Sequence, residues 1–176
     1  MDKKRGFLSL AGKRKFFFLI ILVSLLSPLG DTFGQKHLTR ALYWQTVGED
    51  NVQCLLCPRR CFIEKGKRGY CGVRMNRQGE LFTLAYNNPV AVAIDPIEKK
   101  PFFHVLPASG ALSIAVAGCN LRCLFCQNWH ISQKKPDETI NYDLSPQDIV
   151  SLAKQYHAPS IVFTYTEPTV FYEYML

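Results

Sequence analysis

The pattern of apolar and polar residues changes near residue 110. Before it, residues 80–86 and 90–94 alternate or favour extended structure, and they predict two β-strands. After it, residues 111–117 are apolar without interruption, as in a parallel strand covered on both faces, and residues 160–165 repeat that pattern. The second half of the chain is therefore expected to contain two apolar strands.

One amphipathic helix is predicted between these two strands. Ser145 is placed to cap it, with Pro146 at the first helical position and Asp148 where a capping-box acid reaches back. Pro159 closes the helical pattern. Its apolar positions recur at helical spacing and define one face, made of Ile149, Leu152, Ala153 and Tyr156. A strand, a helix and a parallel strand form the unit of α/β barrels and open sheets, whose functional groups lie at the carboxyl ends of the strands.

The fold class expected from this order of elements is α/β. Because two parallel strands cannot cover both faces of a sheet or close a barrel, residues 111–176 are expected to be the truncated front part of a longer barrel. Ahead of them, we expect a strand-rich lead-in over residues 76–110 and a loop-rich cysteine module over residues 54–75. Residues 35–53 are expected to be a linker with a short amphipathic piece.

Residues 1–34 have the pattern of a targeting or anchoring segment. Basic residues precede the apolar run 16–26, which is shorter than the about 20 residues that span a membrane comfortably. The interpretation is a signal peptide or a short signal anchor, and the alternatives are a buried core helix or a misassigned start codon. Residues 4–12 also resemble a twin-arginine export signal, with Lys4 in place of the first arginine.

The formal net charge of +7 arises almost entirely from the first residues of the chain. Residues 1–40 hold eight Lys or Arg against two Asp, which leaves only +1 for the remainder. The remainder therefore has no basic stripe for phosphate groups, and no nucleic-acid partner is expected. With 48% hydrophobic residues, the chain has enough apolar material for a core.

Seven cysteines fall into two groups whose spacing suits metal ions better than mutual pairing. The first group is a complete set of four and predicts a second metal site formed by Cys54, Cys57, Cys61 and Cys71. Zinc and a second iron–sulfur cluster are both left open there, with free thiols as a third alternative.

The second group has three members, and they follow the predicted strand 111–117: Cys119, Cys123 and Cys126. Four thiolates close the coordination of zinc or of a [4Fe–4S] cluster, whereas three leave one iron open to an outside ligand. Such a vacancy turns an electron carrier into a catalyst. The alternative is a structural zinc loop with His130 as its fourth ligand.

The segment CNLRCLFC, residues 119–126, resembles the signature of the radical S-adenosylmethionine (SAM) enzymes. The resemblance implies that the three cysteines hold a [4Fe–4S] cluster, whose open iron binds SAM for reductive cleavage to a 5′-deoxyadenosyl radical. It also implies that Phe125 packs against the adenine and that Glu167 contacts the amino group of the cofactor. Tyr165 and Thr166 stand where the family has glycines.

Four ordered segments, 54–74, 95–107, 118–132 and 163–174, together resemble the radical enzyme of the AmmeMemoRadiSam system. That family is similar to pyruvate formate-lyase activating enzymes. The resemblance implies the N-terminal portion of a partial (β/α)6 TIM-like barrel, an electron donor of flavodoxin or ferredoxin type, and a protein as candidate substrate. It also places beside the site a charged loop that would ordinarily be a solvated turn, formed by Asp95, Glu98, Lys99 and Lys100.

Other functional classes stay open at this point. A noncatalytic iron–sulfur or zinc-binding electron-transfer module is one, an inactive fragment of the enzyme is another, and a membrane-tethered scaffold is the third. The basic leader predicts a membrane-associated or exported protein. A cytoplasmic location is the alternative, because low-potential electrons and SAM are supplied in the cytosol.

Overall fold

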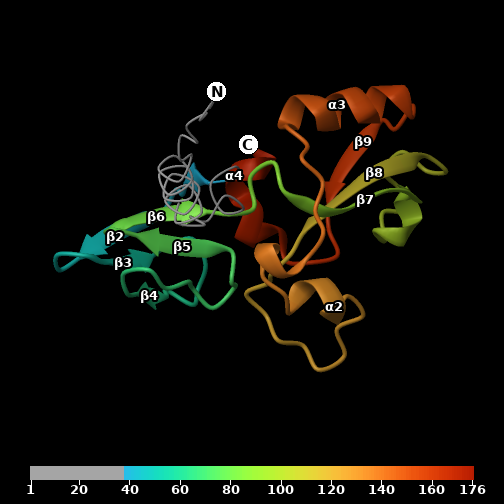
Figure 1. Ribbon diagram of the computed structural model, residues 1–176. Helices are drawn as coiled ribbons and strands as arrows, with labels where there is room; N and C mark the ends of the chain where they lie inside the picture. The colour runs from blue at the N-terminus through green and yellow to red at the C-terminus, as the bar shows by residue number, and fades with distance from the viewer. Residues whose placement is uncertain (1–37) are drawn as a thin grey trace, which may run out of the picture. The chain divides into compact units, whose positions relative to one another are not determined.

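Three small sheets carry residues 38–176, the part of the chain that the computed structural model describes (Figure 1). The strands, in chain order, are β1 (Thr39–Arg40), β2 (Trp44–Val47), β3 (Asn51–Cys54), β4 (Phe62–Ile63), β5 (Arg74–Arg77), β6 (Glu80–Thr83), β7 (Pro89–Pro96), β8 (Gly110–Val116) and β9 (Ser160–Phe163). The helices are α2 (Trp129–Ser132), α3 (Pro146–Gln155) and α4 (Tyr172–Met175), and the short 3-10 turns are η1 (Ile97–Lys99), η2 (Pro136–Glu138) and η3 (Pro168–Phe171).

Two antiparallel sheets hold the first cysteine group. Their strand orders are β1-β6-β5 and β2-β3-β4. The expectation of a linker over residues 35–53 is wrong from residue 39 onward, because these residues form β1, β2 and most of β3. Ala41 and Val52 are buried there beside Cys54 and form a small core. The strands have only two to four residues, and in β2 the two half-buried residues, Trp44 and Val47, do not alternate with exposed ones, so no clear strand pattern can be read from the sequence.

The third sheet, β7-β8-β9, contains the strand–helix–strand unit expected from the sequence. β7 runs antiparallel to β8, whereas β9 runs parallel to β8 with Ser160 opposite Ala111. The helix α3 precedes β9 and begins at the predicted capping box: the Asp148 amide donates to Ser145 Oγ at 3.1 Å, and the Ser145 amide donates to Asp148 Oδ2 at 2.8 Å. The predicted strand over 160–165 is shortened to β9, because Tyr165 turns the chain with φ of 64°.

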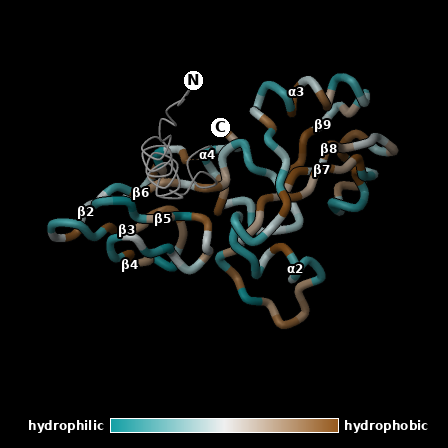
Figure 2. Tube along the Cα trace, in the orientation of Figure 1, coloured by the Kyte–Doolittle hydropathy of each residue, from teal (hydrophilic) through white to brown (hydrophobic). Residues whose placement is uncertain are grey.

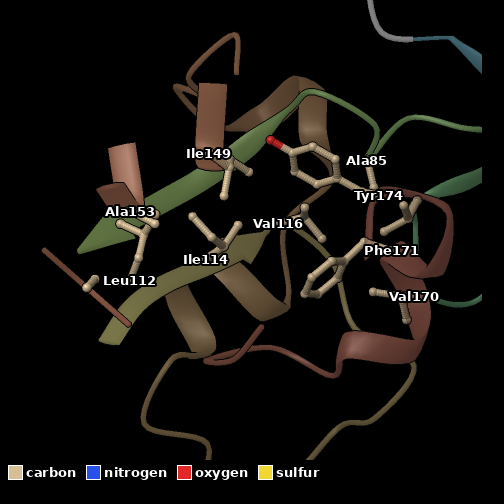
Figure 3. Packing of buried hydrophobic residues seen from close by; sticks show 11 residues of the cluster. Ala85, Leu112, Ile114, Val116, Ile149, Ala153, Val170, Phe171 and Tyr174 are labelled. Atoms are coloured by element: carbon tan, nitrogen blue, oxygen red, sulfur yellow. The ribbon is translucent and has the colours of Figure 1, made fainter. Parts of the chain in front are cut away.

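The main core lies between this sheet and α3. Figure 3 shows Ile149 and Ala153 of α3 directed toward Leu112 and Ile114 of β8. Phe171 extends the same cluster past the end of the strand. In Figure 2 the hydrophobic colour runs along β8 and β9, whereas α3 shows hydrophilic segments on its outside. Burial on one face of α3 is what the spacing of its apolar residues predicts.

The carboxyl ends of β8 and β9 meet at one edge of the sheet because the two strands are parallel. The Thr164 amide donates to the Ile114 carbonyl at 2.9 Å, and Thr166 Oγ1 donates to the Val116 carbonyl at 3.0 Å. The loop after β8 and the turn after β9 are therefore held side by side. This edge carries the second cysteine group.

The mixed α/β content agrees with the expected fold class. Among residues 38–176, β8 and β9 are the one parallel pair, so the six-unit barrel stays a prediction. The predicted targeting segment lies outside the described residues. Within the described range, no helix has both the length and the apolar character needed to cross a membrane.

Candidate metal centre and the neighbouring cysteine pocket

A cavity of about 210 Å³ opens at the carboxyl ends of β8 and β9. The loop after β8 and α2 contribute one wall, with Cys119, Leu121, Cys123, Cys126, Ser132 and Gln133. The turn after β9 contributes the other wall, with Tyr165, Thr166 and Glu167. The structure thus brings the three cysteines of the second group and the predicted glutamate to a single cavity, as the strand-end argument predicts.

Local hydrogen bonds shape the loop that carries the three cysteines. The Cys126 amide donates to the Cys123 carbonyl at 3.2 Å, which closes a turn between these two thiols. The Leu121 amide donates to Cys119 Sγ at 3.4 Å, and Ser132 Oγ lies 3.4 Å from Cys126 Sγ. Two of the three sulfurs therefore already have a hydrogen-bond partner.

The donor set at this cavity suits a soft metal or an iron–sulfur cluster, because thiolates are the preferred ligands of both. As placed, no three His, Cys, Asp or Glu side chains of residues 38–176 are close enough to hold a metal ion. Binding therefore needs the thiols to turn inward, and Cys123, which is exposed, has the freedom to do so. His130 is exposed and does not line the cavity, so the geometry does not favour it as a fourth ligand.

Glu167 and Phe125 differ in how they are placed. Glu167 Oε1 accepts hydrogen bonds from Thr169 Oγ1 at 2.6 Å and from the Thr169 amide at 3.4 Å, so its carboxylate is fixed at the start of η3. Phe125 is 91% exposed and is not among the residues that line the cavity. Its predicted contact with adenine stays a prediction.

The charged loop before residue 101 is a solvated turn only in part, because the Lys99 side chain is exposed whereas Asp95 is buried. The Asp95 side chain is buried and accepts hydrogen bonds from Lys99 Nζ at 3.0 Å, Lys100 Nζ at 2.7 Å and Ser113 Oγ at 2.9 Å. The Tyr165 hydroxyl also donates to this carboxylate. The network therefore ties β7 and β8 to the turn that forms one wall of the cavity.

The balance of forces on Asp95 favours its charged form. Burial raises the pKa of this carboxyl, but the hydrogen bonds from Lys100, Tyr165, Lys99 and Ser113 outweigh it and lower the pKa well below its usual range. Burial, and then the hydrogen bond to Asp95, raise the pKa of the Tyr165 hydroxyl. Both groups keep their ordinary neutral-pH forms, so the network is intact at neutral pH.

The first cysteine group lines a separate, smaller cavity of about 20 Å³. Its wall contains all four thiols, together with Arg59, Arg74 and Asn120. Arg74 is 2% exposed, and its Nη1 donates to Cys54 Sγ at 3.3 Å. The structure therefore gathers the second predicted set, which is spread over residues 54–71, around one small space.

The two cysteine groups are in direct backbone contact. Gly118 has φ of 95°, and a Cβ built on it would lie 2.5 Å from both the Cys71 carbonyl oxygen and Val73 Cγ2. Only glycine has room at this position. Cys71 of the first group is thereby packed against the residue that precedes Cys119 of the second.

A stack of three side chains joins the same two segments. The Arg59 guanidinium lies 3.5 Å from the centre of the Tyr70 ring, and the Arg122 guanidinium lies 4.4 Å from it. Arg122 Nη2 also donates to the Tyr70 carbonyl at 2.9 Å, and Arg59 Nε donates to the Asn120 carbonyl. Sequence reasoning missed this stack, although arginines next to cysteines in both groups were a visible signal.

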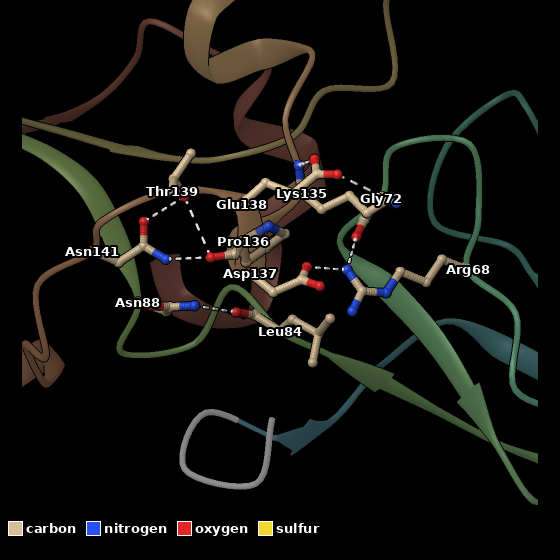
Figure 4. Close-up of polar contacts among 10 residues, drawn as sticks. All are labelled: Arg68, Gly72, Leu84, Asn88, Lys135, Pro136, Asp137, Glu138, Thr139 and Asn141. Atoms are coloured by element: carbon tan, nitrogen blue, oxygen red, sulfur yellow. Dashed lines mark hydrogen bonds and ion pairs between the residues drawn. The ribbon is translucent and has the colours of Figure 1, made fainter. Parts of the chain in front are cut away.

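The turn after Cys71 is also held by the segment that follows α2 (Figure 4). Arg68 Nη1 donates to the Gly72 carbonyl at 3.4 Å and pairs with Asp137 Oδ1 at 2.5 Å. The Lys135 amide donates to Glu138 Oε2 at 2.8 Å and fixes η2 beside this turn. The cysteine module is therefore anchored to the β8–β9 segment by several independent contacts.

Comparison with known proteins finds one family model that is similar to the second part of the chain. Residues 113–176 match the family model described as the radical SAM superfamily. The similarity covers the part of the chain that carries the three-cysteine cavity, and a domain of this superfamily implies a [4Fe–4S] cluster and SAM in general. The match begins within β8 and includes both walls of the cavity.

Individual relatives are similar over parts of their length. The chain is 46% identical to "Uncharacterized protein MJ0808" of Methanocaldococcus jannaschii over 138 residues, which are 78% of this chain and 41% of that protein. It is 30% identical to "Uncharacterized protein MJ0674" of the same organism over 102 residues, 57% of this chain and 25% of that one. The 7-carboxy-7-deazaguanine synthase of Halobacterium salinarum is 34% identical over 73 residues, 38% of this chain and 27% of that enzyme.

The chain thus spans less than half the length of the curated relatives it matches. No solved structure matches it. The comparisons show similarity to the radical SAM superfamily over residues 113–176, and the narrower AmmeMemoRadiSam assignment stays a prediction from the resemblance of the four sequence segments.

Proposed function

We propose that the chain is a radical SAM enzyme whose catalytic cavity lies at the carboxyl ends of β8 and β9. The observation that carries the proposal is that Cys119, Cys123 and Cys126 line one cavity together with Glu167. Three thiols and one carboxylate are the donor set that a three-ligand cluster and a cationic amino group need. The superfamily match over residues 113–176 supports the same conclusion.

The cluster with bound SAM would supply a 5′-deoxyadenosyl radical that abstracts hydrogen from a substrate. The chain's own part is to hold three irons through thiolates and to leave the fourth without a protein ligand. The Leu121 amide and Ser132 Oγ contact the sulfurs of Cys119 and Cys126. Because hydrogen bonds to ligand sulfurs change the reduction potential of a cluster, these two groups tune the site.

Glu167 is the group we assign to the cationic amino end of SAM. Its Oε1 is fixed by Thr169, and a carboxylate has lone pairs left to accept further hydrogen bonds. Tyr165 and Thr166 precede it in the same wall, and Thr166 is held to the end of β8. Phe125 lies in the cysteine loop with its ring exposed, so contact with adenine needs this loop to fold inward when the ligand binds.

The test is anaerobic reconstitution with iron and sulfide, followed by reduction with dithionite in the presence of SAM. We expect about four irons per chain bound by the three-cysteine loop and formation of 5′-deoxyadenosine. Replacing Cys119, Cys123 and Cys126 together with alanine should abolish both. His130→Ala is the matched control, because this exposed side chain lies in α2 outside the cavity and should leave both unchanged. An iron-loaded, reduced protein that forms no 5′-deoxyadenosine refutes the proposal.

A noncatalytic metal-binding module is the second candidate, and the pocket lined by four thiols favours it. Metal analysis separates the two candidates. A protein that binds zinc alone, in an amount unchanged by the triple alanine replacement, would support the noncatalytic module. Iron that is lost with the three cysteines supports the enzyme.

Partners and location are proposals that rest on the resemblance and the leader. We propose a low-potential electron donor of flavodoxin or ferredoxin type, and a protein as substrate, as in activating enzymes. We also propose membrane association or export through residues 1–34, with a cytoplasmic location as the alternative. Fractionation of cells that express the chain with a carboxyl-terminal tag tests the location, and removal of residues 1–34 is its control.

A further inference from the structure

We propose that the pocket of the first cysteine group is a closed structural site for a single zinc-type divalent ion, and not for a second iron–sulfur cluster. The ligands are the four thiols that line it, Cys54, Cys57, Cys61 and Cys71. This assignment does not depend on the radical chemistry proposed for the neighbouring cavity. The sequence left both kinds of metal open, and the size of the pocket is what distinguishes them.

The backbone brings the four cysteines together from different elements. Cys54 ends β3, and its amide donates to the Cys61 carbonyl at 2.9 Å across the loop that leads to β4. The Arg60 amide donates to the Cys57 carbonyl at 3.2 Å, which forms the tight turn of a metal knuckle. A Cβ built on Gly69 would lie 3.8 Å from Cys61 Sγ, so the chain before Cys71 passes directly beside that thiol.

The size of the pocket favours one ion. Its volume of about 20 Å³ is close to the roughly 10–15 Å³ that a single water molecule needs by the same kind of measure. A cubane of four irons and four sulfides does not fit in that space without moving the walls. A tetrahedral ion held by four sulfurs does, once the side chains rotate toward the centre. That rotation is needed, because no three described ligands are yet within metal-binding reach.

The walls explain why the site would be structural. Leu56, Ile63 and Val170 line the pocket with apolar side chains, and Ile63 and Val170 are 1% and 2% exposed. A zinc site with four protein ligands and no access for water is closed, whereas a catalytic zinc site keeps one position open.

The positively charged side chains in the wall of this pocket suit a metal site that carries net negative charge. Four thiolates around a divalent ion carry two net negative charges. The Arg74 guanidinium donates to Cys54 Sγ at 3.3 Å, and the Arg59 side chain lies in the same wall. Hydrogen bonds from such outer groups orient ligands and stabilise their anionic form. Arg74 is also paired with Glu173, and Arg59 also stacks on Tyr70, so the protein holds both arginines in place beside the thiols.

The ion would also fix the neighbouring cysteine loop, a consequence that does rest on the proposed function. Asn120 lines the zinc pocket and directly follows Cys119. The Cys71 carbonyl packs on Gly118 with no room for a Cβ. An ion that locks Cys71 therefore locks the start of the loop that holds the [4Fe–4S] cluster. We expect iron to leave the cluster faster when this ion is absent.

The experiment is metal analysis of the full chain after anaerobic purification, combined with zinc X-ray absorption spectroscopy. We expect one zinc per chain, with four sulfur ligands at about 2.3 Å. Cys57→Ser should lose the zinc and still bind iron, although this iron should leave the cluster faster than in the wild-type protein. Cys123→Ala is the matched control, because it should lose iron and retain zinc. These opposite losses distinguish failure of this proposal from failure of the proposed radical enzyme.

Two results overturn the assignment. One is a protein that contains no zinc but more iron than one [4Fe–4S] cluster holds, and that loses about four irons per chain in Cys57→Ser. This result would place a second cluster in the pocket. The other is zinc bound through nitrogen or oxygen, or zinc content unchanged in both Cys57→Ser and Cys61→Ser. Should Cys57→Ser fail to fold, the spectrum of the cobalt-substituted wild-type protein decides, because four thiolates around cobalt give intense tetrahedral visible bands.

Discussion

A buried ion pair connects the cysteine module to the carboxyl-terminal helix, and its removal gives a sharp test of the fold. Arg74 Nη2 pairs with Glu173 Oε1, and the two side chains are 2% and 5% exposed. Glu173 Oε1 also accepts a hydrogen bond from the Leu42 amide at 2.8 Å, and Arg74 Nη1 donates to the Leu42 carbonyl at 2.9 Å. The pair therefore joins β5, the segment after β1, and α4.

The change we propose is Glu173→Gln, which keeps the shape of the side chain but removes its charge. The Arg74 guanidinium is then buried without a counterion, a defect that costs about 3–5 kcal/mol. Because the new amide oxygen can still accept from the Leu42 amide, we expect the lower end of this range, about 3 kcal/mol. Typical domains have a free energy of unfolding of about 5–15 kcal/mol, so the loss is large.

Replacing both partners, as Arg74→Met with Glu173→Leu, should be much less harmful than the sum of the single changes. Arg74 Nε and Glu173 Oε2 are buried without hydrogen-bond partners among the described residues, so the pair does not recover its full cost of desolvation. We expect the double variant to lie within about 2 kcal/mol of the wild-type protein. If the single changes Arg74→Met and Glu173→Leu each cost about 3 kcal/mol or more, the coupling energy is then at least about 4 kcal/mol.

The assay is urea unfolding of the metal-free protein, followed by far-ultraviolet circular dichroism under reducing conditions. Glu80→Gln is the matched control, because Glu80 pairs with Arg40 at 3.1 Å on the surface, where the side chains are 49% and 66% exposed. Its effect should be under about 1 kcal/mol. Additive effects of the two core changes, or a Glu173→Gln protein as stable as Glu80→Gln, would refute the reasoning.

Three further predictions concern the cavity and its supports. In thermal unfolding, Gly118→Ala should destabilise the protein more than Gly48→Ala does. Both glycines have positive φ, but of the two only Gly118 lacks space for a Cβ. Equal effects would exclude a clash between the new Cβ and the Cys71 carbonyl oxygen. The hydrogen-bond network lowers the pKa of Asp95, so the stabilisation that the charged carboxylate provides is present at neutral pH and is lost as the pH falls below about 4. The difference in the free energy of unfolding between the wild-type protein and Asp95→Asn should therefore shrink below that pH. A difference that does not depend on pH would contradict this. Tyr70→Leu should lower the free energy of unfolding by about 0.5–1 kcal/mol for each arginine contact that is lost. Tyr70→Phe should not lower it, because it keeps the aromatic ring. Equal losses in the two variants would assign the effect to the hydroxyl group.

The sequence predicts elements that depend on local signals. The capping box at Ser145 and the apolar runs of β8 and β9 each consist of a few adjacent residues. The structure confirms the helix start and the two strands that they predict. The common cavity of the second cysteine group and Glu167 also follows, because the ends of parallel strands must meet at one edge.

Features that join distant residues were not predictable in this way. Tyr165 and Asp95 are 70 positions apart, and Arg122 and Tyr70 are 52 apart, so no local pattern relates them. The linker expected before residue 54 was wrong for another reason. Its strands are two to four residues long, and at that length alternation cannot be distinguished from irregular chain.

The contacts around Gly118 imply that the positions of the two cysteine groups are coupled. A backbone contact without room for a Cβ cannot absorb movement, because close-packed atoms transmit displacement to their neighbours. The Tyr70 stack and the Arg68–Asp137 pair hold the same two segments on either side of that contact. We therefore expect a change that moves Cys71, such as loss of the proposed metal ion, to displace Cys119 as well. The cysteine module would then act on catalysis through the position of the cluster loop, without contacting the substrate.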